Sequence, residues 1–257
     1  MPRKAPSARP EVESEDRESD PAPAPARNQI PQPAKRPHAS GKNPGDHEDL
    51  TRLALRACLI ARDAAFNVRD LLTSNSRMAF LAIKDCEKEL DLLERQIDDQ
   101  LPAAITRVNE ARARQLLASL KCTTDLERIG DLVMSVALRV QSRTGKMPAA
   151  DVRQLVTMSE ILRDMLDLIH KGFVALDLEC ARKVLQMDKD VDRVCHTMFQ
   201  KHLTENASQG DASGFEVLLM AQALERAGDH TTNLAEELYS LIEGRSLRHM
   251  PKKRAAQ

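Results

Sequence analysis

The chain carries an internal repeat, and this feature constrains its architecture more than any other. The segment Leu126-Glu127-Arg128-Ile129-Gly130-Asp131 returns, little changed, as Leu224-Glu225-Arg226-Ala227-Gly228-Asp229, 98 residues later. A second match accompanies it, because Glu87 and Asp91 correspond to Asp188 and Asp192, 101 residues further along. Since a repeated sequence indicates a repeated structural unit, we expect one module of roughly 100 residues to occur twice. Each copy should hold the same two acidic pairs.

Both halves have the hydrophobic pattern of amphipathic helices, and strand signals are nearly absent. Apolar residues recur at intervals of three and four, which is the helical period. Turn signals at 73–76, 145–148 and 208–214 divide the chain further, so we expect three helices in each half. Short links make neighbouring helices antiparallel, which predicts an up-down-up bundle. The core stripes of the first and third helices are expected to be Leu50, Leu53, Ala57, Ile60, Ala61, Ala64, Val68 and Leu71, and Leu116, Leu117, Leu120, Leu126, Ile129, Val133, Val136 and Val140.

The predicted fold is therefore all-α, with two tandem three-helix bundles related by the repeat. We expect the bundles at residues 47–146 and 147–245, followed by a basic tail at 246–257. Residues 1–46 hold ten of the 13 prolines, and Val12 and Ile30 are their only large aliphatic residues. Such a segment buries too little apolar surface to offset the entropy of ordering the chain, so we expect a disordered tail.

Composition excludes several classes of function. The net charge is −1, Trp is absent and there is one Tyr, so the aromatic platforms and basic face of a nucleic-acid site are missing. Five cysteines without a CxxC spacing indicate reduced thiols packed in helices. No signal peptide and no apolar run of about 18 residues is visible. We expect a cytoplasmic protein that meets the membrane only peripherally, through partners.

Hairpin symmetry indicates that the acidic pairs face one another. Two residues of an antiparallel hairpin lie level when the turn falls midway between them. In the second half this midpoint lies at 208–209, inside the predicted turn. In the first half it falls at Asn109, and Pro102 complicates the pattern. A proline in a helix interior removes a hydrogen bond, so either the second helix bends there or the turn begins earlier.

Facing carboxylate pairs would form an anionic site. Carboxylates at i and i+4 share one helix face, and oxygen-rich sites suit hard cations and iron. In a chain with 30% charged residues such pairs also arise without function, and Arg128 and Arg226 offer local ion-pair partners. His230, Asn233 and Glu236 could extend the second site. The candidate metal ligands are Glu87, Asp91, Glu127 and Asp131 in the first half, and Asp188, Asp192, Glu225 and Asp229 in the second.

These motifs resemble the PhoU family of phosphate-uptake regulators. The resemblance covers residues 48–245, and the segment from Leu224 to Glu236 is its most specific part. It implies metal clusters of iron or another hard divalent cation, such as magnesium or manganese. It also implies a non-catalytic homodimer in the cytoplasm, a negative regulator that links an ABC phosphate transporter to a sensor histidine kinase. The first half departs from the pattern, because Ser135 and Leu138 stand where the second half has Asn233 and Glu236.

Two alternatives remain open at this point. One is a helical scaffold that binds no metal. The other is a carboxylate-bridged di-iron oxidoreductase, which needs a Glu-x-x-His motif on each of two helices. The closest approach is Asp167-x-x-His170, in a single copy. The sequence shows no nucleophile–base pair and no glycine loop that would cradle a phosphate, which favours an adaptor over an enzyme.

Overall fold

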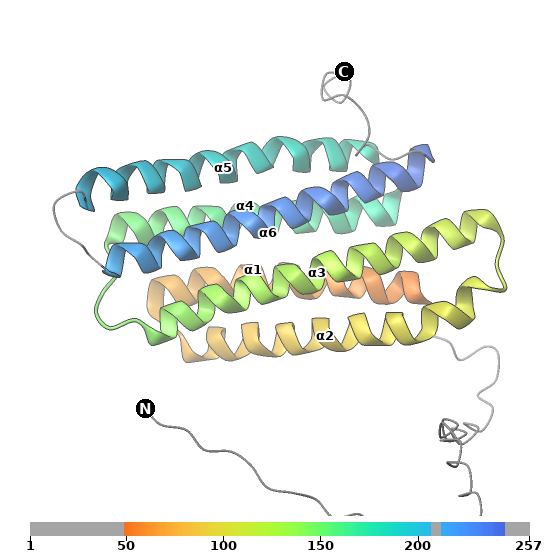
Figure 1. Ribbon diagram of the computed structural model, residues 1–257, viewed down its shortest axis with the longest axis horizontal. Coiled ribbons are helices and arrows are strands. Elements are labelled where there is room, and N and C mark those ends of the chain that lie inside the picture. The colour runs from red at the N-terminus through yellow and green to blue at the C-terminus, as the bar shows by residue number, and fades with distance from the viewer. Residues whose placement is uncertain (1–48, 207–211, 245–257) are drawn as a thin grey trace, which may run out of the picture. The chain divides into compact units, whose positions relative to one another are not determined.

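The computed structural model describes residues 49–206 and 212–244, and it confirms the all-α fold class with six helices and no strand in these ranges (Figure 1). The predicted disordered tail, the basic tail and most of the predicted turn at 208–214 lie outside the described residues. None of the six helices is both long enough and apolar enough to cross a membrane. The helices are α1 Leu50–Ser74, α2 Arg77–Ile105, α3 Glu110–Ser142, α4 Ala149–Ala175, α5 Leu178–Asn206 and α6 Ala212–Glu243.

Short polar residues or glycine flank several of the helices, as the turn signals indicated, whereas Leu176 ends α4 in a left-handed conformation. Asn75 adopts a left-handed conformation after α1, and Gly244 ends α6 with φ of 70° while its N–H donates to the carbonyl of Ser240. A side-chain oxygen at an N-cap satisfies one of the free N–H groups of the first turn. The side chains that accept such a bond belong to Asp49, Ser76, Asn109 and Asp177.

The second helix continues through Pro102, which stands in its last turn before the end at Ile105. The missing N–H of the proline thus costs the helix a hydrogen bond only at its end. The link to α3 occupies residues 106–109, so the turn begins earlier than the midpoint at Asn109.

Each repeat is a three-helix bundle, and the two bundles meet through equivalent helices. Helices α1, α2 and α3 pack on one another, as do α4, α5 and α6. Between the repeats α1 contacts α4, its own counterpart, and α3 contacts α6, its own counterpart (Figure 1). Contacts between equivalent helices are expected when the two repeats are related by a twofold axis. Helices α2 and α5 contact only their own repeat, so the acidic pairs lie on the outer hairpins α2–α3 and α5–α6.

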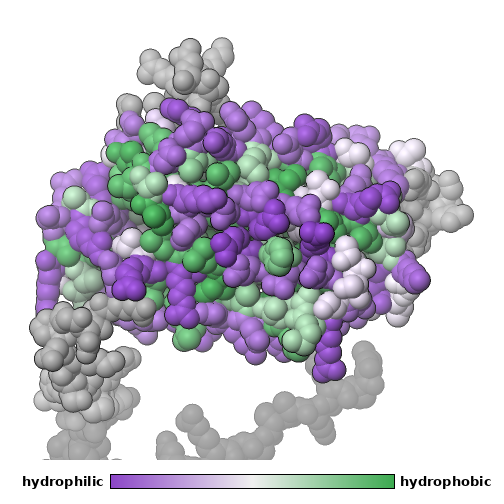
Figure 2. All heavy atoms as spheres, turned by 180° about the vertical axis from the view of Figure 1, so that it is seen from behind, coloured by the Kyte–Doolittle hydropathy of each residue, from purple (hydrophilic) through white to green (hydrophobic). Residues whose placement is uncertain are grey.

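The core follows the predicted stripes, with one error. All eight stripe residues of α1 are buried. Leu117 was predicted to be in the core but is 42% exposed, because its neighbour Leu116 takes the inward position and is 2% exposed. On the face shown in Figure 2, apolar residues gather in small areas separated by polar ones. Isolated exposed apolar residues of this kind are ordinary on protein surfaces.

A buried ion pair that the sequence did not indicate joins α4 to α5. Asp151, in the first turn of α4, is fully buried, and its Oδ1 accepts from Nζ of Lys201 at 3.0 Å. Nε2 of His202 lies 3.2 Å from the same oxygen. Because charged groups are rarely buried without partners, this contact fixes the start of α4 against the end of α5.

Candidate metal centres

The first acidic cluster is formed by facing positions of α2 and α3. Glu87 and Asp91 lie one turn apart on α2, and Glu127 and Asp131 lie one turn apart on α3. One carboxylate oxygen from each of Glu87, Asp91 and Asp131 lies within 4.8 Å of the other two. The predicted alignment of the two helices therefore brings three of the four candidates close enough to share a cation.

Glu127, the fourth candidate, is not one of these three residues and lies beside the guanidinium of Arg128. Nε of Arg128 lies 3.3 Å from its Oε2, and Nη1 of Arg128 lies 3.3 Å from Oδ2 of Asp131. The predicted local ion pair of Arg128 is therefore confirmed. The Oε2 atom of Glu127 is buried and accepts no hydrogen bond, so the guanidinium of Arg128 is its charge partner without satisfying it as an acceptor. A buried acceptor in this state is costly, which favours an added cation beside it.

The electrostatics of the first cluster favour an added positive charge. Burial raises the pKa of Glu87, and the charges of Asp91 and Asp131 raise it further. Burial also raises the pKa of Glu127, with Asp131 as the next cause. Carboxylates repel one another at this range, so Glu87 and Glu127 hold their protons to higher pH than isolated carboxyls do.

The second acidic cluster occupies the equivalent place on α5 and α6. Burial raises the pKa of Asp188 to about 6, and the charges of Asp192, Asp229 and Glu225 contribute in that order. The Oδ1 atom of Asp188 is buried and accepts no hydrogen bond. The mutual effects of these charges place all four predicted residues near one another. The cluster is nevertheless looser than the first, because among the described residues only Glu87, Asp91 and Asp131 bring three ligand atoms within 4.8 Å.

Two glycines allow the helices to approach at the clusters. A β-carbon at Gly130 would stand 2.6 Å from Cδ1 of Leu90. A β-carbon at Gly228 would stand 3.2 Å from Oδ1 of Asp188. A β-carbon at either position would force the neighbouring side chain to shift, which explains why both copies of the motif accept the helix-weakening effect of glycine.

The residues present fit a bound cation. Each cluster offers four carboxylates from two helices, and each contains one buried oxygen without a hydrogen-bond donor, on Glu127 and Asp188 respectively. Magnesium, manganese, calcium and iron are held by oxygen-rich sets of this kind. We expect the clusters to hold cations at these eight carboxylates.

Two of the three residues predicted to extend the second cluster lie elsewhere. His230 and Asn233 face the other repeat, where Nδ1 of His230 lies 2.8 Å from Oδ1 of Asp125 and Nδ2 of Asn233 donates to the same oxygen at 3.1 Å. Asp125 stands on α3, so this contact belongs to the α3–α6 interface. Asp125 was missed because nothing in the local sequence marks the partner of an interface residue.

Two further residues beside the second cluster were also missed. Cys195 and His196 follow Asp192 on α5, at positions i+3 and i+4. They line an open hollow together with Asp192 and Glu225. The spacing from Asp192 was a signal that could have found them, because it places all three residues on one helix face.

The contacts of Asp167 do not resemble those of a di-iron ligand. Its carboxylate pairs with Lys171 and lies 3.6 Å from Nη1 of Arg62, on the α1–α4 interface. Burial lowers the pKa of His170, with the charge of Arg62 as the next cause. Asp167 and His170 therefore belong to the ion-pair contacts of the α1–α4 interface and are not members of either acidic cluster.

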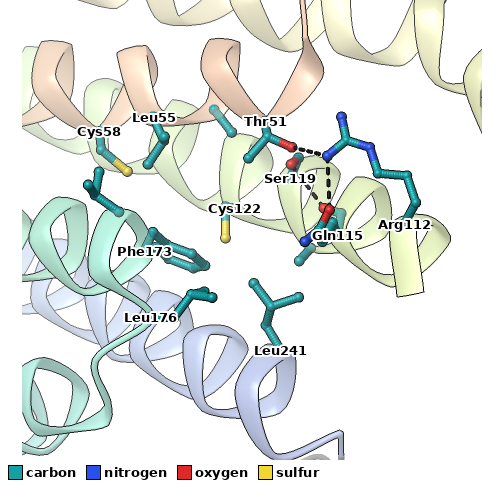
Figure 3. A pocket seen from close by; sticks show the side chains of 13 residues that line it. Thr51, Leu55, Cys58, Arg112, Gln115, Ser119, Cys122, Phe173, Leu176 and Leu241 are labelled. Atoms are coloured by element: carbon teal, nitrogen blue, oxygen red, sulfur yellow. Dashed lines mark hydrogen bonds between the residues drawn. The ribbon is translucent and has the colours of Figure 1, made fainter. Parts of the chain in front are cut away.

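An apolar pocket of about 210 Å³, partly open to solvent, lies between the two repeats (Figure 3). The thiols of Cys58 and Cys122 and the ring of Phe173 line its interior. At one side Nη1 of Arg112 donates to Oγ1 of Thr51 at 3.2 Å and to Gln115. Arg112 also pairs with Asp49 at 2.6 Å, so its charge is already balanced. The pocket shares no residue with the acidic clusters.

Comparison with known proteins agrees with the family resemblance inferred from the sequence. A family model described as the PhoU domain matches residues 54–140 and 155–238, one copy in each repeat. The chain is 27% identical over 227 residues to a phosphate-specific transport system accessory protein PhoU homolog from Burkholderia sp, covering 86% of this chain and 97% of that protein. A protein of the same description from Rhizobium meliloti (strain 1021) is 28% identical over 198 residues, covering 75% and 83%.

Two solved structures have the same fold. The crystal structure of PhoU from Pseudomonas aeruginosa matches with a TM-score of 0.69 and 23% identity, covering 77% of this chain and 97% of that one. The phosphate transport system regulatory protein PhoU from Streptococcus pneumoniae matches with a TM-score of 0.69 and 20% identity, covering 77% and 95%.

Proposed function

The chain belongs to the PhoU family, and from this premise we propose that it is a non-catalytic negative regulator of phosphate uptake in the cytoplasm. It would act as an adaptor between an ABC phosphate transporter and a sensor histidine kinase, keeping the kinase quiet while phosphate is plentiful. The similar proteins are named as accessory and regulatory proteins of phosphate transport, which supports the link to the transporter. The kinase partner and a homodimeric state follow from the resemblance.

The observation that carries the regulatory proposal is the pair of carboxylate clusters on the outer hairpins. Glu87, Asp91, Glu127 and Asp131 would hold one cation site, and Asp188, Asp192, Glu225 and Asp229 the other. A bound cation supplies positive charge that offsets the repulsion among the carboxylates. Because each cluster joins two helices, its occupancy would determine how firmly α2 is held to α3 and α5 to α6. An adaptor that works through helix surfaces needs such firmly held faces.

The regulatory role is tested by deleting the gene and assaying alkaline phosphatase in phosphate-rich medium. We expect constitutive activity in the deletion strain and restored repression with the wild-type gene. The double variant Asp131→Asn/Asp229→Asn should fail to restore repression. Glu110→Gln serves as the control, because Glu110 is 80% exposed and lies outside both clusters. Full repression in the deletion strain would exclude the regulator.

A metal-free scaffold is the competing function, and the same strains separate it from the proposal. Elemental analysis of the full chain, purified without chelator, should find bound cation in the wild type and less in the double variant. Repression restored by a double variant that holds no metal would favour the scaffold. Sedimentation of the purified chain measures whether it is a homodimer.

A further inference from the structure

The apolar pocket between the repeats has the size and the location of a small-molecule site. Its side chains come from α1 and α3 in the first repeat, and from α4, the residue after α4, and α6 in the second (Figure 3). A cavity of about 150 Å³ holds benzene, so the pocket volume of about 210 Å³ has room for roughly eight non-hydrogen atoms. A molecule bound there contacts both repeats at once.

The interior of the pocket suits an apolar body. Cys58, Cys122 and the ring of Phe173 surround it (Figure 3). Burial raises the pKa of both thiols, so they stay protonated and behave as small hydrophobic groups. An aromatic ring adds a flat apolar surface against which a second ring or a short chain can pack.

One side of the pocket carries hydrogen-bonding groups. Nη1 of Arg112 donates to Oγ1 of Thr51 at 3.2 Å and to Oε1 of Gln115 at 2.9 Å. Both bonds use acceptor atoms, so the hydroxyl of Thr51 and the amide of Gln115 keep their own protons as donors. The charge of Arg112 is balanced by Asp49 at 2.6 Å. This side therefore suits a neutral oxygen better than an anion.

The internal repeat supplies a comparison for the positions that line the pocket. The two PhoU domain copies begin at residues 54 and 155 and end at residues 140 and 238. Leu155 thus stands where the pocket has Ala54, and Met220 stands where it has Cys122. Leu155 and Met220 are fully buried. Small side chains therefore create the pocket, because the fold accepts larger ones at the equivalent positions.

The pocket is also bordered by a leucine in a conformation that leucine rarely adopts. Leu176 follows α4 with φ of 52° and ψ of 47°, in the left-handed region. The equivalent residue after α1 is Asn75, with φ of 50°. Asparagine tolerates this region, whereas a branched apolar side chain is strained there. The repeat therefore has an unstrained alternative for this position.

Burial in the free protein does not compensate for this strain. The side chain of Leu176 lines the pocket but is 56% exposed, and its neighbour in the lining, Val174, is 61% exposed. Strained residues gather at sites of function. A bound molecule would cover the exposed part of both side chains, which accounts for an apolar residue at a position suited to asparagine.

We propose that this pocket binds a small neutral molecule of the alcohol or phenol class. Its apolar body lies against Cys58, Cys122 and Phe173, and its oxygen accepts a hydrogen bond from Thr51 or Gln115. Because the molecule joins helices of both repeats, its binding stabilises their contact. The pocket is an input apart from the acidic clusters, and the proposal does not rest on the proposed function.

Benzyl alcohol is the probe, since it combines a ring of suitable size with one hydroxyl group. Titration of the full-length chain, followed by nuclear magnetic resonance, should show saturable binding with a Kd on the order of 1 mM. Benzoate, which carries a negative charge, should bind at least about tenfold more weakly, because Asp49 already balances Arg112. Thr51→Val, which introduces the residue type of the equivalent position 152, should weaken binding of benzyl alcohol about threefold to tenfold.

Two further variants exchange a pocket residue for its counterpart in the other repeat. Cys122→Met fills the space, so we expect affinity to fall by at least about tenfold. Leu176→Asn removes an apolar wall and relieves strain. It should weaken binding while raising the melting temperature of the free chain by about 2–4 °C. Leu203→Asn is the control, because Leu203 is 67% exposed and lies outside the pocket, and it should leave affinity unchanged.

The results that would overturn the proposal are distinct. They are the absence of saturable binding by the wild type, unchanged affinity in Cys122→Met, and binding of benzoate as tight as that of benzyl alcohol. Circular dichroism shows whether each variant is folded, and Ala54→Leu fills the same space if Cys122→Met does not fold. Phosphatase repression in the deletion strain tests the regulator and has no bearing on the pocket.

Discussion

The Oδ1 atom of Asp188 lies 3.2 Å from the point that a β-carbon at Gly228 would occupy. Asp188 is on α5 and Gly228 is on α6, and both are part of the second acidic cluster or adjoin it. The absence of a side chain at Gly228 lets the carboxylate lie against the backbone of the facing helix. The glycine of the repeated motif therefore sets the position of a candidate ligand without touching a cation itself.

We predict that Gly228→Ala weakens metal binding more than it affects folding. Alanine favours the helix by about 1 kcal/mol over glycine, which offsets part of the crowding. The added methyl group displaces the Asp188 carboxylate, so we expect cation affinity at the second cluster to fall by about tenfold. Thermal unfolding and a manganese titration of the metal-free chain measure the two effects.

Gly130→Ala is the matched control in the first repeat. Its β-carbon would stand 2.6 Å from Cδ1 of Leu90, the flexible end of an apolar side chain. We expect a repacking cost of about 1–3 kcal/mol and little change in manganese affinity, because no ligand is displaced. Loss of affinity in Gly130→Ala equal to that in Gly228→Ala would contradict the role assigned to the Asp188 contact.

The raised pKa of Asp188, about 6 against an ordinary value of 3.8, predicts an unusual pH dependence for the metal-free protein. The folded chain binds this proton more tightly than the unfolded chain does, so protonation stabilises the fold. The stabilising contribution is fully present below about pH 4 and is lost as pH rises through 6. Glu225 and Asp229, whose pKa values burial also raises, act in the same direction.

We therefore expect Asp188→Asn to stabilise the metal-free chain at pH 7 by about 1 kcal/mol, a modest figure because the carboxyl is only half-buried and water screens the repulsion. Urea unfolding at pH 5, 6 and 7 measures the effect, which should shrink toward pH 5. Asp190→Asn, whose carboxylate pairs with Arg193 on the same helix, is the control. A stabilisation that is equal at pH 5 and pH 7 would show that the charge of Asp188 is not its cause.

Periodicity and repetition were sufficient to predict the helices and the facing of the acidic pairs. Both depend on local spacing. Apolar residues at intervals of three and four determine the buried face of a helix, and a turn midway between two acidic pairs places the pairs opposite one another. Leu117 shows the limit of this reasoning. Adjacent leucines at 116 and 117 both fit the apolar pattern, but only one can point inward, and the choice depends on how α3 packs against other helices.

Contacts between the repeats could not be predicted in this way. The carboxylate of Asp125 meets His230 and Asn233 across more than 100 residues of sequence. The burial of Asp151 against Lys201 likewise depends on which helix ends meet. Neither relation has a spacing that repeats. The first emerges only when the two bundles are placed together, and the second only when α4 packs against α5.

Removal of the Asp125 carboxylate should weaken the interface between the repeats and leave the metal clusters intact. In Asp125→Ala, His230 and Asn233 lose their shared acceptor in a partly buried position, which costs about 1–3 kcal/mol. Thermal unfolding should detect this loss, with unchanged manganese affinity. Glu110→Ala, which breaks an exposed pair with Arg114, should cost less than about 1 kcal/mol. A change in manganese affinity in Asp125→Ala would mean that His230 belongs to the metal site after all.

The five cysteines should differ sharply in their reaction with iodoacetamide, since the thiolate is the reactive form. Cys58 and Cys122 line the apolar pocket of Figure 3. Burial raises the pKa of Cys58 to about 12 and raises the pKa of Cys122 well above its ordinary value. Cys180 is only partly buried, so its sulfur is more accessible although burial and the bond to Asp177 raise its pKa too. Mass spectrometry at pH 8 should find Cys180 modified first, and Cys58 and Cys122 unmodified until the chain is unfolded in guanidinium.

The surroundings of Cys195 add a second distinction among these thiols. Cys195 borders an open hollow, unlike the two pocket cysteines, but burial and the charges of Glu225 and Asp192 raise the pKa of its thiol to about 11. We therefore expect Cys195 to be modified more slowly than Cys180 and faster than Cys58 and Cys122, with Cys180 as the internal control in every sample. Modification of Cys58 and Cys122 at the rate of Cys180 in the folded protein would mean that the apolar pocket opens to solvent.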